Sequence, residues 1–139
     1  MSAQYFSPTG LDDAIALLAG GNIRPLAGGT DIFPALGTTP LSHDLLDISR
    51  IPALKEIVVS ETGVRIGAAA TWSEIVAADL PRAFDGLKAA AREVGGRQIQ
   101  NAGTLAGNIC NASPAADSVP PLLTLGAEVE LTGPGGRRC

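Results

Sequence analysis

The sequence predicts an α+β fold built as two small lobes. Its 139 residues suffice for one domain or two small lobes, and 45% hydrophobic against 17% charged residues favours a packed core over disorder. Segments with helical spacing alternate with short strand-like runs. Two glycine-rich loops, far apart in the chain, interrupt this alternation. We expect residues 1–52 to form a small α/β lobe and residues 53–139 a larger lobe with a mixed or antiparallel sheet.

The first lobe is predicted to contain two helices and two strands. Thr9 and Asp12 fit a capping box at the start of a helix that ends at Gly20. The next predicted elements are a strand over 24–27, a helix over 32–36 and a strand over 45–48. The first glycine-rich loop therefore joins a strand to the start of a helix. The boundary between the lobes is expected near residues 50–56.

The second lobe begins with a predicted hairpin, residues 57–59 and 64–67, around the turn Glu61-Thr62-Gly63. Thr71 and Glu74 fit a second capping box, which opens a helix that runs to about Ala78. A third helix is predicted from Pro81 to the stop at Gly95-Gly96. Its apolar side consists of Leu80, Phe84, Leu87, Ala91 and Val94.

The end of the sequence predicts a strand and a turn. Ala127, Val129 and Leu131 alternate with glutamates, which is typical of a half-buried strand. The turn over 133–136 leads into Arg137-Arg138-Cys139, the expected start of a return strand. Because an uncovered strand edge is a liability, we expect the fold to be truncated at its C-terminus or completed by a partner.

Composition excludes several functions. The formal net charge of −4, without a basic face, argues against nucleic acid as a partner. Two cysteines without a CxxC pair and a single histidine, His43, argue against a zinc site or an iron–sulfur cluster on this chain. There is no apolar run long enough for a membrane span and no leader-like N-terminus, so the cytoplasm is the expected location.

The first glycine-rich loop, Leu26-Ala27-Gly28-Gly29-Thr30-Asp31, has the chemistry of a phosphate cradle. Glycines let the backbone approach an oxyanion, and Thr30 adds a hydroxyl donor. Asp31 would repel phosphate, so it either accepts backbone N–H groups or binds a ribose hydroxyl. The alternative is an ordinary strand–helix turn with Asp31 as the helix cap.

The second loop, residues 101–108, offers Gly103 and Gly107 for close backbone contact and Thr104 and Asn108 as donors. Its alternative interpretation is a loop whose polar residues only satisfy turns. Asp117 follows and either holds a ribose or caps the next apolar segment. Together, the two loops predict a dinucleotide held between two lobes, with its pyrophosphate bound without a lysine.

Neither loop matches GxGxxG or a P-loop, which disfavours a Rossmann dehydrogenase and a nucleotide kinase. There is no hydrolytic triad and no cluster of acid and base residues. We therefore assign no catalytic residue, and expect the chemistry to come from a cofactor and from partners.

The chain resembles the N-terminal part of the FAD-binding (medium) subunit of molybdenum hydroxylases, the xanthine dehydrogenase and carbon monoxide dehydrogenase type. The resemblance covers essentially the whole chain. It is carried by residues 25–31, by residues 47–52, and by residues 96–100 leading into residues 101–117. One departure is Ala106, where many members have a glycine.

The resemblance implies the FAD-binding fold of the vanillyl-alcohol-oxidase type and an oxidoreductase flavoprotein that works only with partners. It implies an iron–sulfur small subunit (2Fe-2S) and a molybdopterin large subunit as those partners, and NAD or another acceptor for the electrons. It also implies a role for Asp117 near the cofactor. The residues it implies for the pyrophosphate are Leu26, Ala27, Gly28, Gly29, Thr30, Asp31 and Ile32, with Thr104, Leu105, Ala106, Gly107 and Asn108.

Two alternatives stay open at this point. The chain could be a flavin-free, truncated piece that serves only in assembly. It could also be a flavoenzyme like UDP-N-acetylmuramate dehydrogenase on the same fold, which would need an acid donor and a substrate domain.

Overall fold

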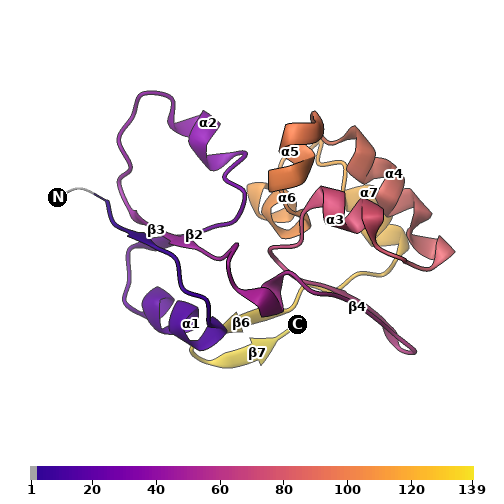
Figure 1. Cartoon of the computed structure of the whole chain (residues 1–139), viewed down its shortest axis with the longest axis horizontal. Coiled ribbons are helices and arrows are strands. Elements are labelled where there is room, and N and C mark those ends of the chain that lie inside the picture. The colour runs from indigo at the N-terminus through magenta and orange to yellow at the C-terminus, as the bar shows by residue number, and fades with distance from the viewer. Residues whose placement is uncertain (1–2) are drawn as a thin grey trace.

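A three-stranded parallel sheet organises the first half of the chain in the computed structural model, which describes residues 3–139. The central strand β3 (Asp44–Asp47) lies between β1 (Tyr5–Phe6) and β2 (Ile23–Leu26). Helix α1 (Leu11–Ala19) packs on this sheet, and α2 (Ile32–Leu36) follows β2 (Figure 1). The buried side chains of Ala14, Leu46 and Ile51 form the core of this half.

The second half is mainly helical. Its connection to the first half is a short 3-10 turn, η1 (Pro52–Leu54), and the hairpin of β4 (Ile57–Ser60) and β5 (Gly63–Ile66) follows. The remaining helical elements are α3 (Trp72–Ala77), η2 (Arg82–Phe84), α4 (Asp85–Glu93), α5 (Arg97–Ala102), α6 (Leu105–Asn111) and α7 (Val119–Thr124). They cluster on the side away from the parallel sheet (Figure 1).

A second core holds these helices together. Trp72 and Ile75 of α3, Leu87 and Ala91 of α4, and Leu105 of α6 are its buried members. Leu80, Phe84 and Val94 pack against them, which confirms the predicted apolar side of residues 80–94. The helix α4 itself begins only at Asp85, because the residues after Pro81 form the 3-10 turn η2.

The chain ends in a hairpin that returns to the first half. Strands β6 (Leu131–Gly133) and β7 (Gly136–Arg138) pair antiparallel, and β6 contacts α1 (Figure 1). The predicted return strand is confirmed. The predicted half-buried strand over 127–131 is wrong, because residues 127–130 are not in a strand and Val129 and Leu131 are exposed.

One of the two predicted capping boxes is present in the structure. The capping box at Thr71 and Glu74 is present, with both reciprocal hydrogen bonds. The box predicted at Thr9 and Asp12 is wrong: the N-cap of α1 is Gly10, and no side chain caps it. The helix starts one residue later than the box requires, and its first turn keeps Asp12 and Asp13 beside the positive helix end.

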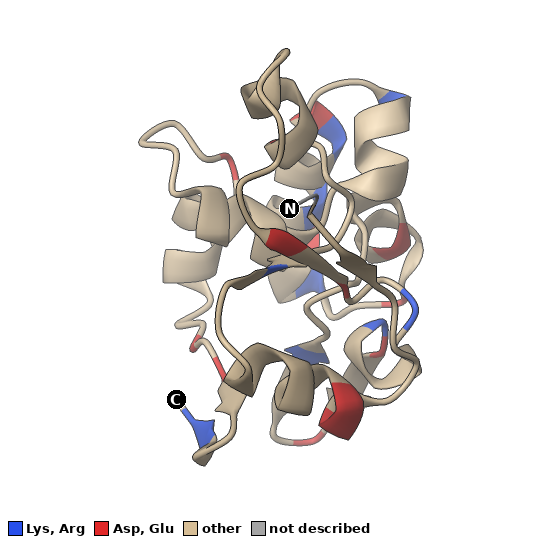
Figure 2. Cartoon of the chain, turned by 90° about the vertical axis from the view of Figure 1, so that its left-hand side faces the viewer, with Lys and Arg blue, Asp and Glu red and all other residues tan. Residues whose placement is uncertain are grey.

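Acidic and basic residues are spread over both halves of the chain (Figure 2). In residues 3–139 no helix is long and apolar enough to cross a membrane. The same residues contain no group of three or more His, Cys, Asp or Glu side chains that could hold a metal ion.

Candidate functional site

A cleft lies where the two glycine-rich segments meet. Its volume is about 420 Å³, and we call it the glycine cleft. Three predicted site residues line it: Ala27, Gly28 and Thr104. Its other lining residues are Ser49, Arg50, Lys55, Ala69, Thr71, Asn101 and Ala102. Both halves of the chain therefore contribute walls to one cleft, as expected for a ligand held between them.

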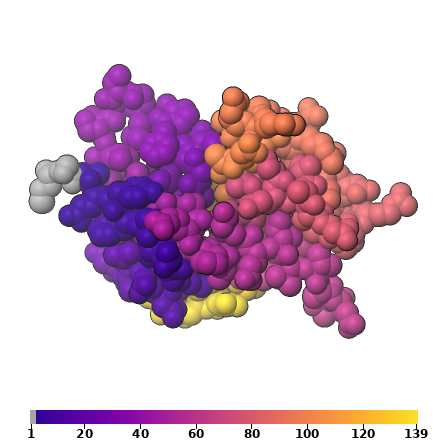
Figure 3. Space-filling model, in the orientation of Figure 1, coloured from indigo at the N-terminus to yellow at the C-terminus, as the bar shows by residue number. Residues whose placement is uncertain are grey.

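The two segments touch at two points. A Cβ added to Gly28 would lie 1.8 Å from the carbonyl oxygen of Ala102, so only glycine fits there. A Cβ added to Gly103 would lie 3.2 Å from the Thr30 hydroxyl oxygen. The surfaces near residue 30 (purple) and residue 100 (orange) meet accordingly (Figure 3). Gly28 therefore permits a close contact with the backbone of Ala102. This contact fixes the position of the cleft.

The first segment leaves a row of donors without partners. Among residues 3–139, no hydrogen bond uses the backbone N–H of Gly28, Gly29, Thr30 or Asp31. Gly29 adopts φ +69°, a conformation that favours glycine. Asp31 is the N-cap residue of α2, but its exposed side chain makes no cap hydrogen bond. Consecutive free N–H groups of this kind form an anion-binding concavity.

The remaining residues of the first segment lie at its ends. Leu26, the last residue of β2, is buried, and its carbonyl accepts from the Ile48 N–H at 2.9 Å. Ile32 begins α2 and is half-buried. These two side chains anchor the segment in the fold and are not among the residues that line the glycine cleft.

The second segment is helical, so the predicted loop over 101–108 is wrong. Helix α5 ends at Ala102 and α6 begins at Leu105, with only Gly103 and Thr104 between them. The Thr104 hydroxyl caps α6 by accepting from the Gly107 N–H at 3.0 Å. Trp72 donates its backbone N–H to the Gly103 carbonyl at 3.1 Å, which ties this bend to α3.

Other predicted residues of this segment lie behind the cleft wall. Leu105 is part of the buried core, and Ala106 and Gly107 are half-buried in α6. Asn108 is also half-buried, and its side-chain oxygen accepts from the fully buried Ser118 hydroxyl at 2.5 Å. This bond turns the two amide hydrogens of Asn108 away from Ser118 and leaves them for another partner.

Asp117 is not brought to the glycine cleft. Its side chain is exposed and makes no hydrogen bond within the described part of the chain. The N-cap position of α7 belongs to Ser118, so the predicted alternative that Asp117 caps this helix is wrong. A role for Asp117 toward a ribose stays a prediction.

An acidic residue at the end of the central strand holds the part of the cleft around Ser49 and Arg50, which the sequence did not predict. Asp47, at the end of β3, accepts hydrogen bonds from the Ser49 N–H at 2.8 Å and the Tyr5 hydroxyl at 2.5 Å. Burial raises the pKa of Asp47, but these bonds and one from Ser7 outweigh it and hold the pKa below its ordinary value. The bond to Asp47 also raises the pKa of Tyr5. Asp47 thereby holds Ser49 and Arg50 at the cleft.

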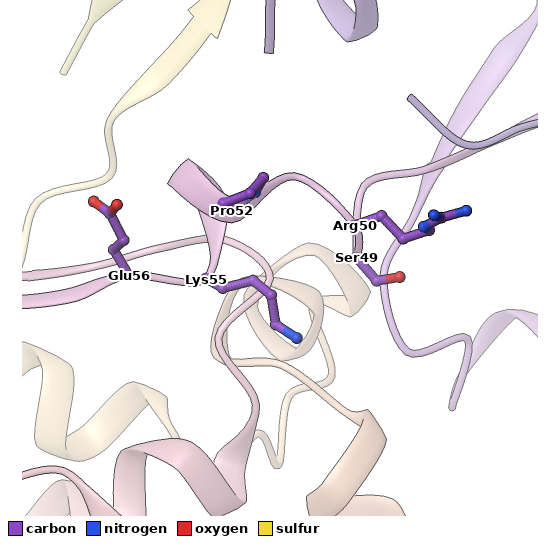
Figure 4. Close-up of a pocket in the computed structure, with 5 residues that line it drawn as sticks. All are labelled: Ser49, Arg50, Pro52, Lys55 and Glu56. Carbon is purple, nitrogen blue, oxygen red and sulfur yellow. The ribbon is translucent and has the colours of Figure 1, made fainter. Parts of the chain in front are cut away.

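A second cavity of about 550 Å³ continues from the glycine cleft. Ser49, Arg50 and Lys55 line both cavities, and Pro52 and Glu56 line only the second. Figure 4 shows the Lys55 and Glu56 side chains leaving the backbone on opposite sides. The cavity available to a ligand therefore extends beyond the part that the two glycine-rich segments line.

The donor set of the glycine cleft fits a diphosphate. Its walls carry Gly28, the first residue of the row of free N–H groups, the hydroxyl of Thr104 and the cations Arg50 and Lys55. The one acidic residue that lines either cavity, among residues 3–139, is Glu56. Neutral and positive donors without an opposing carboxylate favour a bound anion.

Comparisons with known proteins agree with this chemistry. The family model described as "FAD binding domain in molybdopterin dehydrogenase" matches residues 1–139. The glyceraldehyde dehydrogenase medium chain of Sulfolobus acidocaldarius is 37% identical over 137 residues, covering 96% of this chain and 49% of its own. The xanthine dehydrogenase FAD-binding subunit of Escherichia coli O157:H7 is 37% identical over 140 residues, covering 98% and 48%.

A solved structure gives the same fold. Carbon monoxide dehydrogenase from Oligotropha carboxidovorans superposes with a TM-score of 0.90 at 34% identity, over 99% of this chain and 50% of that one. The fold predicted from the sequence is confirmed. The chain spans about half the length of the curated relatives it matches.

Proposed function

The chain belongs to the family of FAD-binding domains of molybdopterin dehydrogenases, and we propose that it binds FAD with the diphosphate in the glycine cleft. The observation that carries the proposal is the row of partnerless N–H groups from Gly28 to Asp31, which begins at Gly28 in the wall of that cleft. Backbone donors of this kind hold phosphate oxygens without needing a basic motif.

The residues proposed to hold FAD belong to both halves of the chain. Gly28 to Asp31 supply backbone N–H groups, and Thr104 and Asn108 supply a hydroxyl and an amide from α6. The buried Leu26 and Leu105 and the half-buried Ile32 keep these groups in place. We propose that the halves, residues 1–52 and 53–139, act as two lobes that enclose the ligand. Asp117 is proposed to meet the ribose.

The proposed role of the whole protein is electron transfer. When bound, FAD would supply two-electron redox chemistry, taking electrons from iron–sulfur clusters and giving them to NAD or another acceptor. The proposed partners are an iron–sulfur small subunit and a molybdopterin large subunit, in the cytoplasm. Two of the relatives are named as a medium chain and an FAD-binding subunit, which supports an assembly of several subunits.

A spectrum of the purified chain tests FAD binding directly. The chain is mixed with excess FAD, desalted and examined by visible absorption. Flavin bands that persist at close to one FAD per chain are the expected result. A colourless chain after desalting would contradict the proposal and favour the flavin-free assembly piece.

A further inference from the structure

The glycine cleft contains a lysine that the sequence did not predict as a ligand residue. Lys55 lines both the glycine cleft and the cavity that continues from it, together with Ser49 and Arg50. The glycine cleft is also lined by Gly28 and Thr104, from the two segments proposed to hold the diphosphate. Lys55 is therefore a cation within the proposed anion site.

The position of Lys55 is fixed by its backbone. Its N–H donates to the Pro52 carbonyl at 2.9 Å, which closes the turn η1. The preceding carbonyl, of Leu54, accepts from the Ala69 N–H at 2.7 Å. A Cβ on Gly67 would lie 2.2 Å from that carbonyl oxygen, so the packing here is tight. A side chain on such a rigid connection is presented to the cleft with little loss of backbone entropy.

The charge of Lys55 is only weakly paired within the protein. Its Nζ lies 3.9 Å from Glu74 Oε1, and both side chains are nearly half exposed, at 45% and 44%. The other oxygen of Glu74, Oε2, already accepts from the Thr71 N–H at 2.7 Å and its hydroxyl at 2.9 Å. A long, exposed ion pair contributes little to stability. The Lys55 ammonium therefore remains available to pair with a bound anion.

Arg50 lines the same two cavities as Lys55, but its side chain takes another direction. Figure 4 shows its side chain pointing away from that of Lys55. The Lys55 ammonium carries three N–H donors, which suit a phosphate oxygen.

We propose that Lys55 is a ligand-binding residue that pairs with the diphosphate of the bound dinucleotide. This inference rests on the proposed function. It replaces the expectation that the pyrophosphate is bound without a lysine. Glu74 lies within 3.9 Å of the Lys55 Nζ and is itself bonded to Thr71, whose backbone bridges to Thr104 at the bend between α5 and α6.

The test is FAD titration of the whole chain in which Lys55 is changed. Lys55→Met keeps the aliphatic stem and removes the charge, so we expect the Kd for FAD to rise about tenfold or more. Lys55→Arg restores a cation and should stay within about threefold of the wild type. Lys88→Met is the matched control, because Lys88 contacts the Ala78 carbonyl and does not line either cavity.

The dependence of FAD binding on ionic strength shows whether Lys55 acts through its charge or through its packing. The difference between the wild type and Lys55→Met should shrink between about 50 mM and about 500 mM NaCl, because salt screens an accessible ion pair. An unchanged Kd for Lys55→Met, a loss that Lys55→Arg shares, or a loss independent of salt would each overturn the inference while the proposed function stands. Failure of the wild-type chain to bind FAD would overturn the proposed function and this inference with it.

Discussion

Gly28 and Ala102 are in backbone contact, with no room for a Cβ between the Gly28 Cα and the Ala102 carbonyl oxygen. Gly28 follows the parallel strand β2, and Ala102 ends the helix α5. The contact therefore joins the two halves of the chain next to the proposed ligand site. Both residues also line the glycine cleft, so the geometry of the cleft depends on this backbone contact.

Gly28→Ala tests the backbone contact between Gly28 and Ala102. The added methyl would lie 1.8 Å from the Ala102 oxygen, so the two segments must move apart. We expect a loss of roughly 1–3 kcal/mol in the free energy of unfolding, together with weaker FAD binding. Chemical denaturation and FAD titration measure the two effects.

Gly135→Ala is the matched control for this substitution. A Cβ there meets nothing within 4 Å, and its φ does not lie in the left-handed region. We expect its stability and FAD binding to match the wild type. Equal behaviour of the two variants would show that the Gly28 contact does not hold the halves together.

Thr104→Val tests the cap of α6. The hydroxyl accepts from the Gly107 N–H, and valine keeps the shape of threonine without that acceptor. The expected loss is about 1 kcal/mol of stability. FAD binding should weaken because the variant lacks the hydroxyl proposed to contact FAD and because the bend between α5 and α6 loosens. Denaturation curves of this variant and of Thr124→Val, whose hydroxyl bonds only its own helix, give the comparison. A Thr104 variant as stable as the wild type would exclude a role for the cap.

Much of this architecture could be predicted from local sequence. The S/T-x-x-E pattern at Thr71 and Glu74 identified a helix start because both partners lie within one turn. Alternating residues around Glu61 to Gly63 identified the hairpin for the same reason. Such features depend on neighbours in the chain, and the structure confirms them.

Features that depend on distant contacts could not be predicted in this way. The helices α5 and α6, of 6 and 7 residues, are too short to show helical spacing, and their glycines and asparagines suggest a loop. Only their packing against α3 and its neighbours makes them helical. The approach of Lys55 to Gly28 and Thr104 likewise arises when the connection at η1 folds between the two halves.

Asp47 makes stability depend on pH. Because its pKa is lower in the folded than in the unfolded chain, its contribution is fully present above the unfolded value, about 3.9 for aspartate. The contribution is lost as the pH falls through the folded value. We expect Asp47→Asn to lower the free energy of unfolding by roughly 1–3 kcal/mol at pH 7, with a smaller difference below about pH 3.

Urea denaturation at pH 7 and below about pH 3 checks this expectation. Tyr5→Phe removes one of the donors to Asp47 and should show the same trend with a smaller amplitude. A difference between the wild type and Asp47→Asn that stays constant across this range would contradict the assignment.

The most direct test of the account is amide hydrogen exchange with and without FAD. The N–H groups of Gly28 to Asp31 have no partner among residues 3–139, so they should exchange quickly in the free chain. If they hold the diphosphate, excess FAD should slow their exchange strongly, while amides of the β6–β7 hairpin keep their rates. Flavin binding with unchanged exchange at residues 28–31 would contradict the glycine cleft as the diphosphate site.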